Sequence, residues 1–542
     1  MNSKTDRADV LIIGAGASGG VAAKHLAVAG FSVVILEQGS WVATSDLPTN
    51  KAEFELLGSG RWNWNPNVRG LDEDYPVNTE ESVAIPGMYN AVGGSMILYA
   101  SCWCRSKPSD FRVRTLDGVA DDWPISYEDL SPYYAAVERE FGVAGKAGNP
   151  AYPPDHQPPL PAHPITNAGR MMAQGMDKLG WHWWPGYNSI PSQKTDHLEQ
   201  CKRLGVCMYG CPEGAKATTD LTHFPDAMKH GAKVITRARV ARITTDDAGL
   251  ATGAVYLQGG VEHFQAADVV IVAANGVGTP RLLLMSASNQ FPDGLANSSG
   301  LVGKRYMTHP FGTSVGIYED PVEDWTGPAG EVIESMEFYE TDESRGFVRG
   351  SKWHIIPSSV APTRMIDRWT KGEGTADESF WGTDFTARMK DMVGHMIEWM
   401  TMPDDLPEET NYIALDHDQT DSDGLPAAKV RYVTGENTKR IVDWNLERSL
   451  EAHEAAGATK AWVTGRNNPS MHNLGTARMG DDPSDSVVDK WGRSHDIPNL
   501  YVIDGSVFVT ATGVNPTATI SAIAKRTATY LVENARKQKV AS

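Results

Sequence analysis

The stretch ADVLIIGAGASGGVAAKHLAVAGFSVVILE, residues 8–37, decides the fold of this chain. Its apolar runs predict a buried strand at residues 9–13 and a second buried strand at residues 32–36. Between them, residues 17–29 predict a helix that ends at Gly30. Strand, helix and strand in this order, within about thirty residues, are typical of a parallel dinucleotide-binding βαβ unit.

The turn between the first strand and the helix carries a nucleotide-binding fingerprint. Gly14, Gly16 and Gly19 fit the pattern GxGxxG, which permits a tight turn, close approach of a pyrophosphate, and close packing of helix on strand. Glu37 closes the second strand, where an acidic side chain can accept hydrogen bonds from ribose hydroxyls; the alternative is a plain surface acid. The fingerprint alone does not distinguish FAD from NAD.

Composition bounds the class of protein. The chain has 542 residues, 41% of them hydrophobic, which is typical of a globular protein of two domains. A net charge of -19 argues against nucleic acid or an anionic membrane as a partner, because both are bound through clustered Lys and Arg. No apolar run reaches the roughly 18 residues of a transmembrane helix, and the first one is too short for a signal peptide. The cytoplasm is therefore the predicted location.

Further elements are predicted downstream. Residues 268–273 and residues 499–503 have the pattern of buried strands. A helix is predicted to start at Pro516 and to run through residue 532. Residues 319–461 have fewer buried runs and many Trp, Met and charged residues, which favours a second, substrate-side domain.

Several segments together point to one family. Ala91-Val92-Gly93-Gly94-Ser95 forms a glycine-rich loop, and residues 274–284 read ANGVGTPRLLL. DWP at residues 122–124 precedes YEDL and PYY, and residues 499–506 read NLYVIDGS. In this order, over essentially the whole chain, these segments resemble the glucose–methanol–choline (GMC) oxidoreductase family.

The resemblance implies an α/β fold with a Rossmann-like FAD-binding domain and a discontinuous α+β substrate-binding domain. The FAD-binding domain would comprise residues 1–310, with a substrate-side excursion around 130–200, and residues 465–542; residues 311–464 would form the substrate-binding domain. The cofactor would be FAD rather than NAD. The implied FAD contacts are Gly14, Gly16, Ser18, Gly19, Glu37, Gly93, Gly94, Ser95, Val240, Asp504, Gly505, Asn515, Pro516 and Thr517.

The resemblance also implies a catalytic pair. His472 begins HNLGT, similar to the family's HxxGT segment, and Asn515 stands in VNPT, similar to the segment of the second partner. Hydride removal from a carbinol carbon leaves a proton on oxygen, and a neutral imidazole is a suitable base for it. A second hydrogen-bonding group would hold the hydroxyl in place. Asn515 also precedes a proline at a helix start, so helix capping is an alternative role.

Three other residues have structural interpretations. His309, in YMTHP, lies in a segment that the family shares and is interpreted as structural. Cys102 and Cys104 follow the first glycine-rich loop and are interpreted as small packing residues.

Cys201, Cys207 and Cys211 fall within eleven residues and are followed by a proline. Three thiolates suit an iron–sulfur cluster with three protein ligands, whereas zinc would call for a fourth ligand and closer pairs. The spacing resembles that of bacterial FAD-dependent sugar and polyol dehydrogenases, which implies a 3Fe–4S cluster. The alternative is three structural cysteines in a relative that has no cluster.

Three functions follow for comparison. The first is a flavin dehydrogenase that oxidises a hydroxyl of a sugar, glycoside or polyol and passes electrons out through the cluster. The resemblance implies that an accessory subunit and a cytochrome could be its partners, and export with a partner could replace the cytoplasmic location. The second is a GMC-type oxidase that uses oxygen without a cluster. The third is a flavoprotein in which FAD is only structural.

Overall fold

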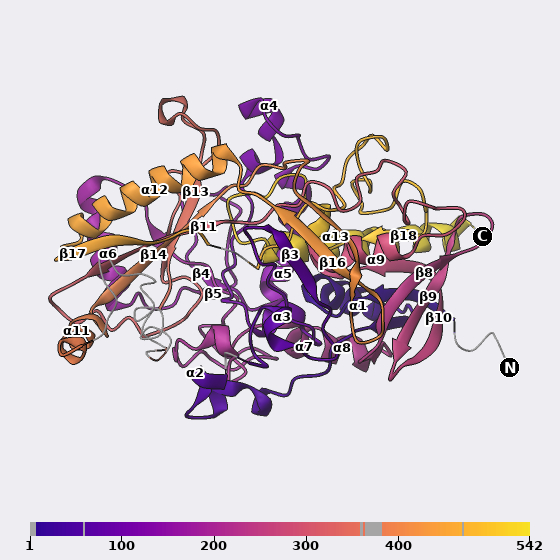
Figure 1. Ribbon diagram of the computed structural model, residues 1–542, viewed down its shortest axis with the longest axis horizontal. Coiled ribbons are helices and arrows are strands. Elements are labelled where there is room, and N and C mark those ends of the chain that lie inside the picture. Colours follow the sequence, from indigo (N-terminus) through magenta and orange to yellow (C-terminus); the bar gives the residue numbers. More distant parts are fainter. Residues whose placement is uncertain are drawn as a thin grey trace.

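Two large β-sheets organise the described part of the chain, which comprises residues 7–57, 60–357, 361, 363, 382–468 and 471–541 of a computed structural model. One sheet contains the N-terminal strands and lies to the right in Figure 1, with helices α1 and α13 beside it. The other lies to the left, next to helix α12. The mixed α/β fold expected from the sequence is confirmed.

The first sheet is built on the parallel strands that the sequence predicted. Strand β1 lies between β2 and β10, with Val10 opposite Val33 on one side and opposite Val269 on the other. Strands β7 and β18 extend the parallel part, whereas β9 and β8 are antiparallel. The strands, in sheet order, are β7 (Lys233–Ile235), β2 (Val33–Leu36), β1 (Ala8–Ile13), β10 (Val261–Val272), β9 (Ala251–Gln258) and β8 (Arg239–Thr245), with β18 (Leu500–Val502) paired to β10.

Two elements extend beyond their sequence-predicted bounds. Strand β10 begins at Val261, well before the predicted residues 268–273. Its first residues, Val261 to Phe264, are exposed and pair with β9, so they show no buried apolar run. Helix α13 (Thr517–Ala541) continues past residue 532 through polar residues that favour helix.

Helices cover this sheet and share its core. Helix α1 (Ala17–Val28) packs against α13 and α8 (Phe224–Lys229), and α13 also packs against α5 (Tyr127–Glu140). The start of α5 is fixed by a capping box: the Ser126 hydroxyl accepts from the Asp129 N–H at 3.3 Å, and the Asp129 carboxylate accepts from the Ser126 N–H at 2.9 Å. Helix α9 (Asn275–Met285) follows β10 directly.

The second sheet is antiparallel and lies beneath α12 (Glu436–Ala455). Helix α6 (Asn167–Leu179) packs against α12, so residues of the predicted excursion around 130–200 lie beside this sheet. Trp353 and Trp399 are buried in its core. Its strands, in order, are β17 (Lys460–Asn468), β11 (Phe311–Ile317), β14 (Met396–Pro403), β13 (Ser351–Ile355), β12 (Ile333–Ser335) and β6 (Trp184–Pro185).

Smaller elements complete the described chain. A third sheet joins β15 (Tyr412–Thr420) to β16 (Pro426–Tyr432) and β16 to β3 (Val77–Ser82), the last pair being parallel. The remaining short elements are β4 (Ala144–Gly145), β5 (Leu160–Pro161), α2 (Phe54–Leu57), α3 (Pro66–Arg69), α4 (Val113–Asp117), α7 (Thr219–Thr222) and α11 (Phe385–Met392). The 3-10 helices are η1 (Thr44–Asp46), η2 (Pro48–Asn50), η3 (Gly94–Ile97), η4 (Pro108–Phe111), η5 (Cys207–Tyr209), η6 (Glu343–Arg345) and η7 (Gly505–Val507).

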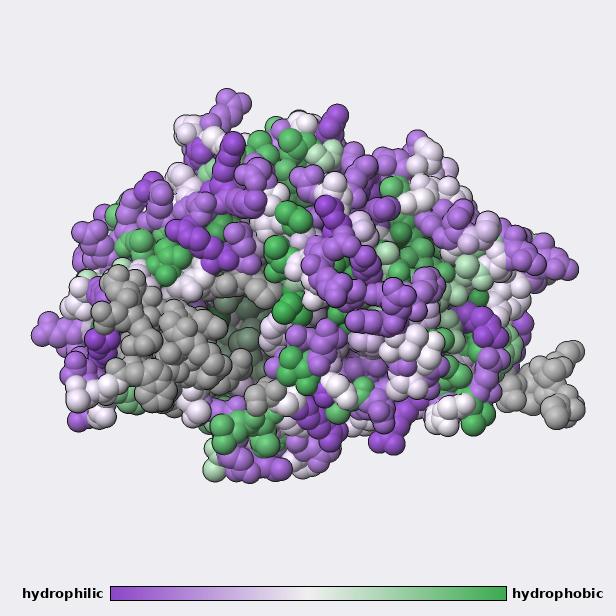
Figure 2. All heavy atoms as spheres, in the orientation of Figure 1, coloured by the Kyte–Doolittle hydropathy of each residue, from purple (hydrophilic) through white to green (hydrophobic). Residues whose placement is uncertain are grey.

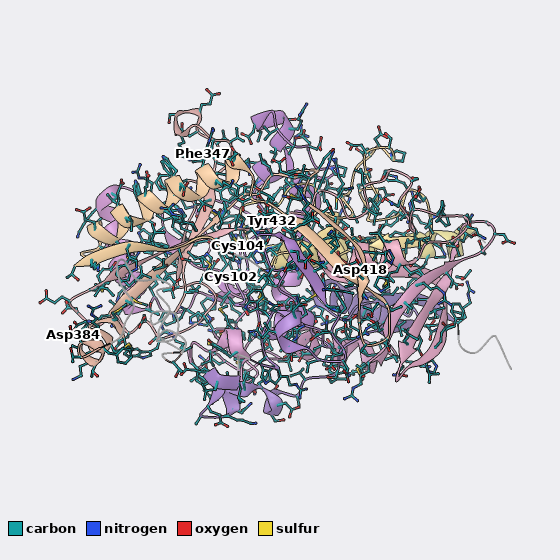
Figure 3. All side chains as sticks on the ribbon, viewed as in Figure 1. Cys102, Cys104, Phe347, Asp384, Asp418 and Tyr432 are labelled. Atoms are coloured by element: carbon teal, nitrogen blue, oxygen red, sulfur yellow. The ribbon has the colours of Figure 1, made fainter. Side chains whose placement is uncertain are left out.

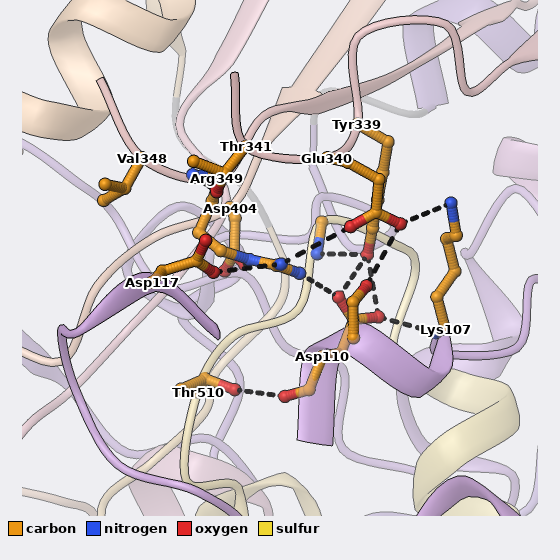
Figure 4. A network of polar contacts seen from close by, with 12 residues as sticks. Lys107, Asp110, Asp117, Tyr339, Glu340, Thr341, Val348, Arg349, Asp404 and Thr510 are labelled. Carbon is orange, nitrogen blue, oxygen red and sulfur yellow. Dashed lines mark hydrogen bonds and ion pairs between the residues drawn. The ribbon is translucent and has the colours of Figure 1, made fainter. Parts of the chain in front are cut away.

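A buried ion network joins distant parts of the chain (Figure 4). Arg349 forms ion pairs with Asp110 and Asp117, and with Asp404 at 3.0 Å. The Tyr339 hydroxyl donates to Asp110 at 2.8 Å and accepts from the Gly513 N–H at 2.9 Å. The network therefore fixes the segment that leads to residue 515.

No helix in the described ranges combines the length and apolarity that crossing a bilayer would require. The face shown in Figure 2 mixes hydrophilic and hydrophobic residues.

Candidate active site

A cavity opens where strands β1, β2 and β10 end at their carboxyl termini. Such edges of parallel sheets commonly bind dinucleotides. The cavity continues to the second sheet, where Phe311 and Met400 line it. Of the residues predicted from the sequence, Gly14, Gly16, Ser18, Glu37, Gly94, Ser95, Val240, His472, Asp504, Gly505, Asn515, Pro516 and Thr517 line this cavity.

Two predicted glycines, Gly19 and Gly93, have packing roles beside the cavity. A side chain at Gly19 would place its Cβ 2.0 Å from the carbonyl oxygen of Gly14, so helix α1 could not pack on the turn. Gly93 has a φ of +100° and its N–H donates to the Ala15 carbonyl at 2.9 Å. Gly93 thereby fixes the glycine-rich loop onto the fingerprint turn.

Gly16 differs from these glycines. A Cβ at Gly16 would meet nothing within 4 Å in the protein, and its φ of -81° suits other residues. Neither packing nor backbone conformation therefore explains the glycine. A bound pyrophosphate close to the backbone does explain it.

Glu37 is buried beneath the turn. Its two carboxylate oxygens each accept one backbone hydrogen bond at 2.8 Å, from the N–H groups of Ala15 and Gly39. Burial raises the pKa of Glu37 to about 7, and the two hydrogen bonds oppose this rise. A carboxylate oxygen can accept a second hydrogen bond, so the predicted contact with a ribose is compatible with this geometry.

Asp504 joins two of the predicted segments. One carboxylate oxygen accepts from the Ser506 N–H at 2.9 Å, and the other accepts from the Thr279 hydroxyl at 2.5 Å and the Asn275 N–H at 3.1 Å. The side chain therefore holds the turn after β18 against the start of α9.

His472 lies in the cavity wall with His309 behind it. The two Nδ1 atoms are 2.8 Å apart, and the rings meet edge to face with centroids 4.9 Å apart. Burial, with smaller electrostatic contributions from His309 and Lys352, holds the pKa of His472 well below its usual range. Its imidazole is therefore neutral near pH 7.

The contacts of His309 fix the tautomer of His472. Nε2 of His309 lies 2.5 Å from the Thr512 carbonyl oxygen, which can only accept, so this nitrogen carries the proton. Burial lowers the pKa of His309 to about 4, so its Nδ1 is an acceptor near neutral pH. Nδ1 of His472 must then be the donor, and Nε2 of His472 carries the lone pair. Interpreting His309 as merely structural was therefore incomplete.

Asn515 has an anchor that the sequence did not indicate. Its Oδ1 accepts from Nζ of Lys352 at 2.7 Å, so this oxygen is bound to a lysine of β13. The Pro516 carbonyl accepts from the Ile520 N–H at 2.9 Å and begins the hydrogen bonding of α13. The structure thus supports a position for Asn515 in the cavity wall, beside the helix start.

Sequence reasoning missed the residues that the second sheet contributes to the cavity. Phe311, His354 and Met400 line it, and Lys352 lies behind it. These residues belong to no shared motif in the sequence. Only the pairing of β11, β13 and β14 brings them to the same wall.

The cysteine loop lies next to the cavity. Cys207 is buried, Cys201 and Cys211 are half-buried, and all three are free. They are close enough to influence one another electrostatically, and burial raises the pKa of Cys207 to about 12. The Sγ of Cys201 accepts from the Arg203 N–H at 3.3 Å, and that of Cys211 from the Ala215 N–H at 3.4 Å. Among the cavity's lining residues is Met208, the residue after Cys207.

Comparisons with known proteins identify a family and a fold. The family models described as GMC oxidoreductase match residues 8–311 and residues 407–524. The chain is 41% identical to 2-methyl-1,2-propanediol dehydrogenase of Mycolicibacterium austroafricanum, over 98% of this chain and 96% of the relative. It is 28% identical to the fructose dehydrogenase large subunit of Gluconobacter japonicus, over 99% and 100%. It is 30% identical to 6'''-hydroxyparomomycin C oxidase of Streptomyces lividus, over 96% and 90%.

Among solved structures, the fold is similar to that of pyridoxine 4-oxidase from Mesorbium loti. The TM-score is 0.65 at 18% identity, and the match covers 96% of this chain and 98% of the other. At that identity the match is evidence for the fold alone.

Proposed function

The chain belongs to the GMC oxidoreductase family, whose members oxidise alcohol groups with FAD, and from this premise we propose that it is a dehydrogenase of polyols or sugars. One observation supports the chemistry above all: a neutral His472 whose tautomer is set by His309, in the wall of a cavity that begins at the dinucleotide turn. Within the chain we propose FAD-binding parts at residues 1–310 and 465–542 and a substrate-binding part at residues 311–464.

The residues around the cavity fit FAD. Gly16 leaves open space at the turn, and the Glu37 carboxylate can accept hydrogen bonds from ribose hydroxyls. The N-terminus of α13 offers backbone N–H groups and a partial positive charge. When bound there, FAD supplies the acceptor for the hydride that leaves the carbinol carbon. The other steps belong to side chains of this chain.

His472 is the proposed base. Its Nε2 accepts the O–H proton of the substrate as the C=O bond forms. Asn515 lines the same cavity and orients the hydroxyl so that its carbon faces the acceptor. The apolar side chains of Phe311 and Met400 exclude water from the reacting atoms.

The substrate class is proposed from the relatives. Two of them are named for a branched diol and for a sugar, which favours a compact polyol. Anaerobic bleaching of the flavin absorption with 2-methyl-1,2-propanediol, D-fructose and simple alcohols tests this directly. A chain that binds FAD but is bleached by none of these alcohols would contradict the proposal.

Variants of the catalytic pair separate chemistry from binding. His472→Ala should retain FAD but reduce the rate of flavin bleaching by about 10²–10⁴-fold, because base catalysis is lost. Asn515→Ala should reduce the rate of flavin bleaching less, because Asn515 only positions the hydroxyl. Bleaching of His472→Ala at the unmodified rate would contradict this assignment.

For the exit of electrons, we propose that Cys201, Cys207 and Cys211 ligate an iron–sulfur cluster, of 3Fe–4S type. The three free thiols in one eleven-residue loop and the N–H bonds to two of the sulfurs support it. The neighbouring Met208 lines the cavity, which supports a position of the cysteine loop beside the proposed FAD site. A cluster passes electrons singly, which suits a cytochrome; that partner, an accessory subunit and the cytoplasmic location remain predictions.

Iron analysis tests the cluster. Protein made anaerobically with iron and sulfide should contain iron, and Cys207→Ser should lose it while substrate still bleaches the flavin. Cys102→Ser, outside the loop, should keep its iron. An iron-free protein that turns over fully with its acceptor would leave the three cysteines as packing residues. Rapid reaction of the bleached flavin with oxygen would instead favour an oxidase, as in the relative from Streptomyces lividus.

A further inference from the structure

We propose that Lys352, held by Glu331, is a positioning residue that locks the amide of Asn515 with its NH2 group as the donor to the substrate oxygen. This inference rests on the proposed function, since it assigns a role to one member of the catalytic pair. The observation that carries it is a fully buried ion pair directly behind that pair.

Burial makes this ion pair unusual. Lys352 is 0% exposed and Glu331 is 1% exposed, and the ammonium group contacts the carboxylate. Moving two charges out of water costs about as much as their attraction returns, so a buried pair is a weak source of stability. Its position in the site therefore calls for another explanation. The two residues come from β13 and from the segment before β12, so only the second sheet places them there.

The hydrogen-bond chemistry of lysine decides which way the amide points. An ammonium group has three donors and no acceptor, so the atom of Asn515 that lies 2.7 Å from Nζ must be its oxygen. A flipped amide would place NH2 against an ammonium group. The NH2 group of Asn515 is therefore the part left to serve the substrate.

The hydrogen-bonding roles of two side chains in the cavity wall are then fixed by residues that lie behind that wall. His472 presents an acceptor, because His309 takes its Nδ1–H. Asn515 presents a donor, because Lys352 takes its oxygen. A substrate hydroxyl that donates to His472 and accepts from Asn515 matches both side chains. As its proton leaves, negative charge develops on the hydroxyl oxygen, where the Asn515 donor stabilises it.

The ammonium group of Lys352 already supplies the positive charge that a metal ion would bring to the carboxylates and thiols around it. Two groups in the described chain have metal-like arrangements, Cys104 with Glu331 and Glu334, and Cys102 with Glu331 and His354. Both share Glu331, which already binds the ammonium group, and Nζ also lies 3.3 Å from Sγ of Cys104. Cys102 and Cys104 lie near the middle of the molecule in the view of Figure 3.

Burial favours the neutral forms of the thiols, the imidazoles and the Glu334 carboxyl group around Lys352. Burial raises the pKa of Glu334 to about 8 and that of Cys102 to about 11, and it raises that of Cys104 well above its usual range. The pKa values of His309, His354 and His472 are lowered chiefly by burial and further by the charge of Lys352. The charge of Lys352 therefore adds to burial in keeping the base unprotonated.

The test uses the FAD-loaded protein, anaerobic stopped-flow flavin bleaching, and 2-methyl-1,2-propanediol and D-fructose as probes. Lys352→Met has an unbranched side chain one atom shorter than lysine and removes the charge and the donor. We expect bleaching to slow by about tenfold, less than the 10²–10³ of a lost direct donor. As the pH is lowered, the rate should also begin to fall at a higher pH than in the unmodified protein. The reason is that His472 loses a neighbouring positive charge, so its pKa rises. Lys352→Arg, which keeps charge and donors, should restore part of the rate.

The double variant Lys352→Met/Asn515→Ala shows whether lysine acts through the amide. Well above the pH midpoint, where His472 is neutral in every variant, it should bleach at the rate of Asn515→Ala alone, and multiplied losses would overturn the inference. So would an unmodified rate and pH midpoint in Lys352→Met. If Lys352→Met misfolds, Lys352→Met/Glu331→Met removes both charges and gives the same readouts. Lys439→Met, on an exposed pair of α12, is the matched control.

The failure of this inference is distinguishable from failure of the proposed function. If His472→Ala and Asn515→Ala bleach slowly while Lys352→Met is unchanged, only the role of Lys352 is wrong. If all three bleach at the unmodified rate, the catalytic pair itself is wrong.

Discussion

At the scale of single residues, the contact between His309 and His472 sets which nitrogen of the base is available. His309→Ala removes the acceptor for Nδ1–H of His472, so the other tautomer becomes accessible. We expect flavin bleaching to slow by about 10-fold to 10²-fold, less than the roughly 10²–10⁴-fold of losing the whole general base. Stopped-flow bleaching with 2-methyl-1,2-propanediol measures it.

A glutamine at the same position is the matched variant, because its amide oxygen can also accept from His472. His309→Gln should therefore retain more activity than His309→Ala. Equal rates for the two variants would show that the hydrogen bond does not control the tautomer.

At the scale of elements, the turn between β1 and α1 combines packing glycines with one that only a ligand explains. Gly16→Ala should leave the thermal stability of the FAD-free protein unchanged, because its Cβ meets nothing within 4 Å. FAD binding should weaken strongly, because the methyl group occupies the approach of the pyrophosphate. FAD titration by fluorescence, alongside thermal melts of the FAD-free protein, separates the two effects.

Two other glycines provide comparison variants for this prediction. Gly60→Ala, also with nothing within 4 Å, should bind FAD normally. Gly94→Ala should lower stability, because its Cβ would lie 2.8 Å from Cα of Gly16 at a φ of +56°. If Gly16→Ala kept full FAD affinity, the pyrophosphate would lie elsewhere.

At the scale of the whole molecule, the Arg349 network holds the second sheet to the segment before Asn515 (Figure 4). Arg349→Met leaves the carboxylates of Asp110 and Asp404 buried without their partner. Breaking a buried pair in this way costs about 3–5 kcal/mol, so the free energy of unfolding should fall by that amount. Urea titration followed by tryptophan and flavin fluorescence measures it.

The matched control is Arg466→Met, because Arg466 pairs with Asp443 at the surface, where both side chains are about half exposed. Surface pairs contribute little, so this variant should unfold like the unmodified protein. Similar losses in the two variants would mean that burial does not make the Arg349 pairs more costly to break than a surface pair.

The sequence by itself determined the parallel sheet, the dinucleotide turn and the family. Strand, glycine turn, helix and strand are local patterns, so residues 8–37 carry them without help from the rest of the chain. The shared segments likewise placed His472, Asp504 and Asn515, which the structure brings to one cavity.

Only the tertiary structure decided how that cavity works. His309 and Lys352 act through atoms 2.8 Å and 2.7 Å from His472 and Asn515, yet 163 residues separate each pair in the chain. No periodicity or spacing signals such contacts, because a hydrogen bond between distant segments depends on how whole sheets pack. The sequence therefore predicted the motif residues of the site, and the packing of the second sheet against the first decided their protonation and orientation and added the residues that no motif signals.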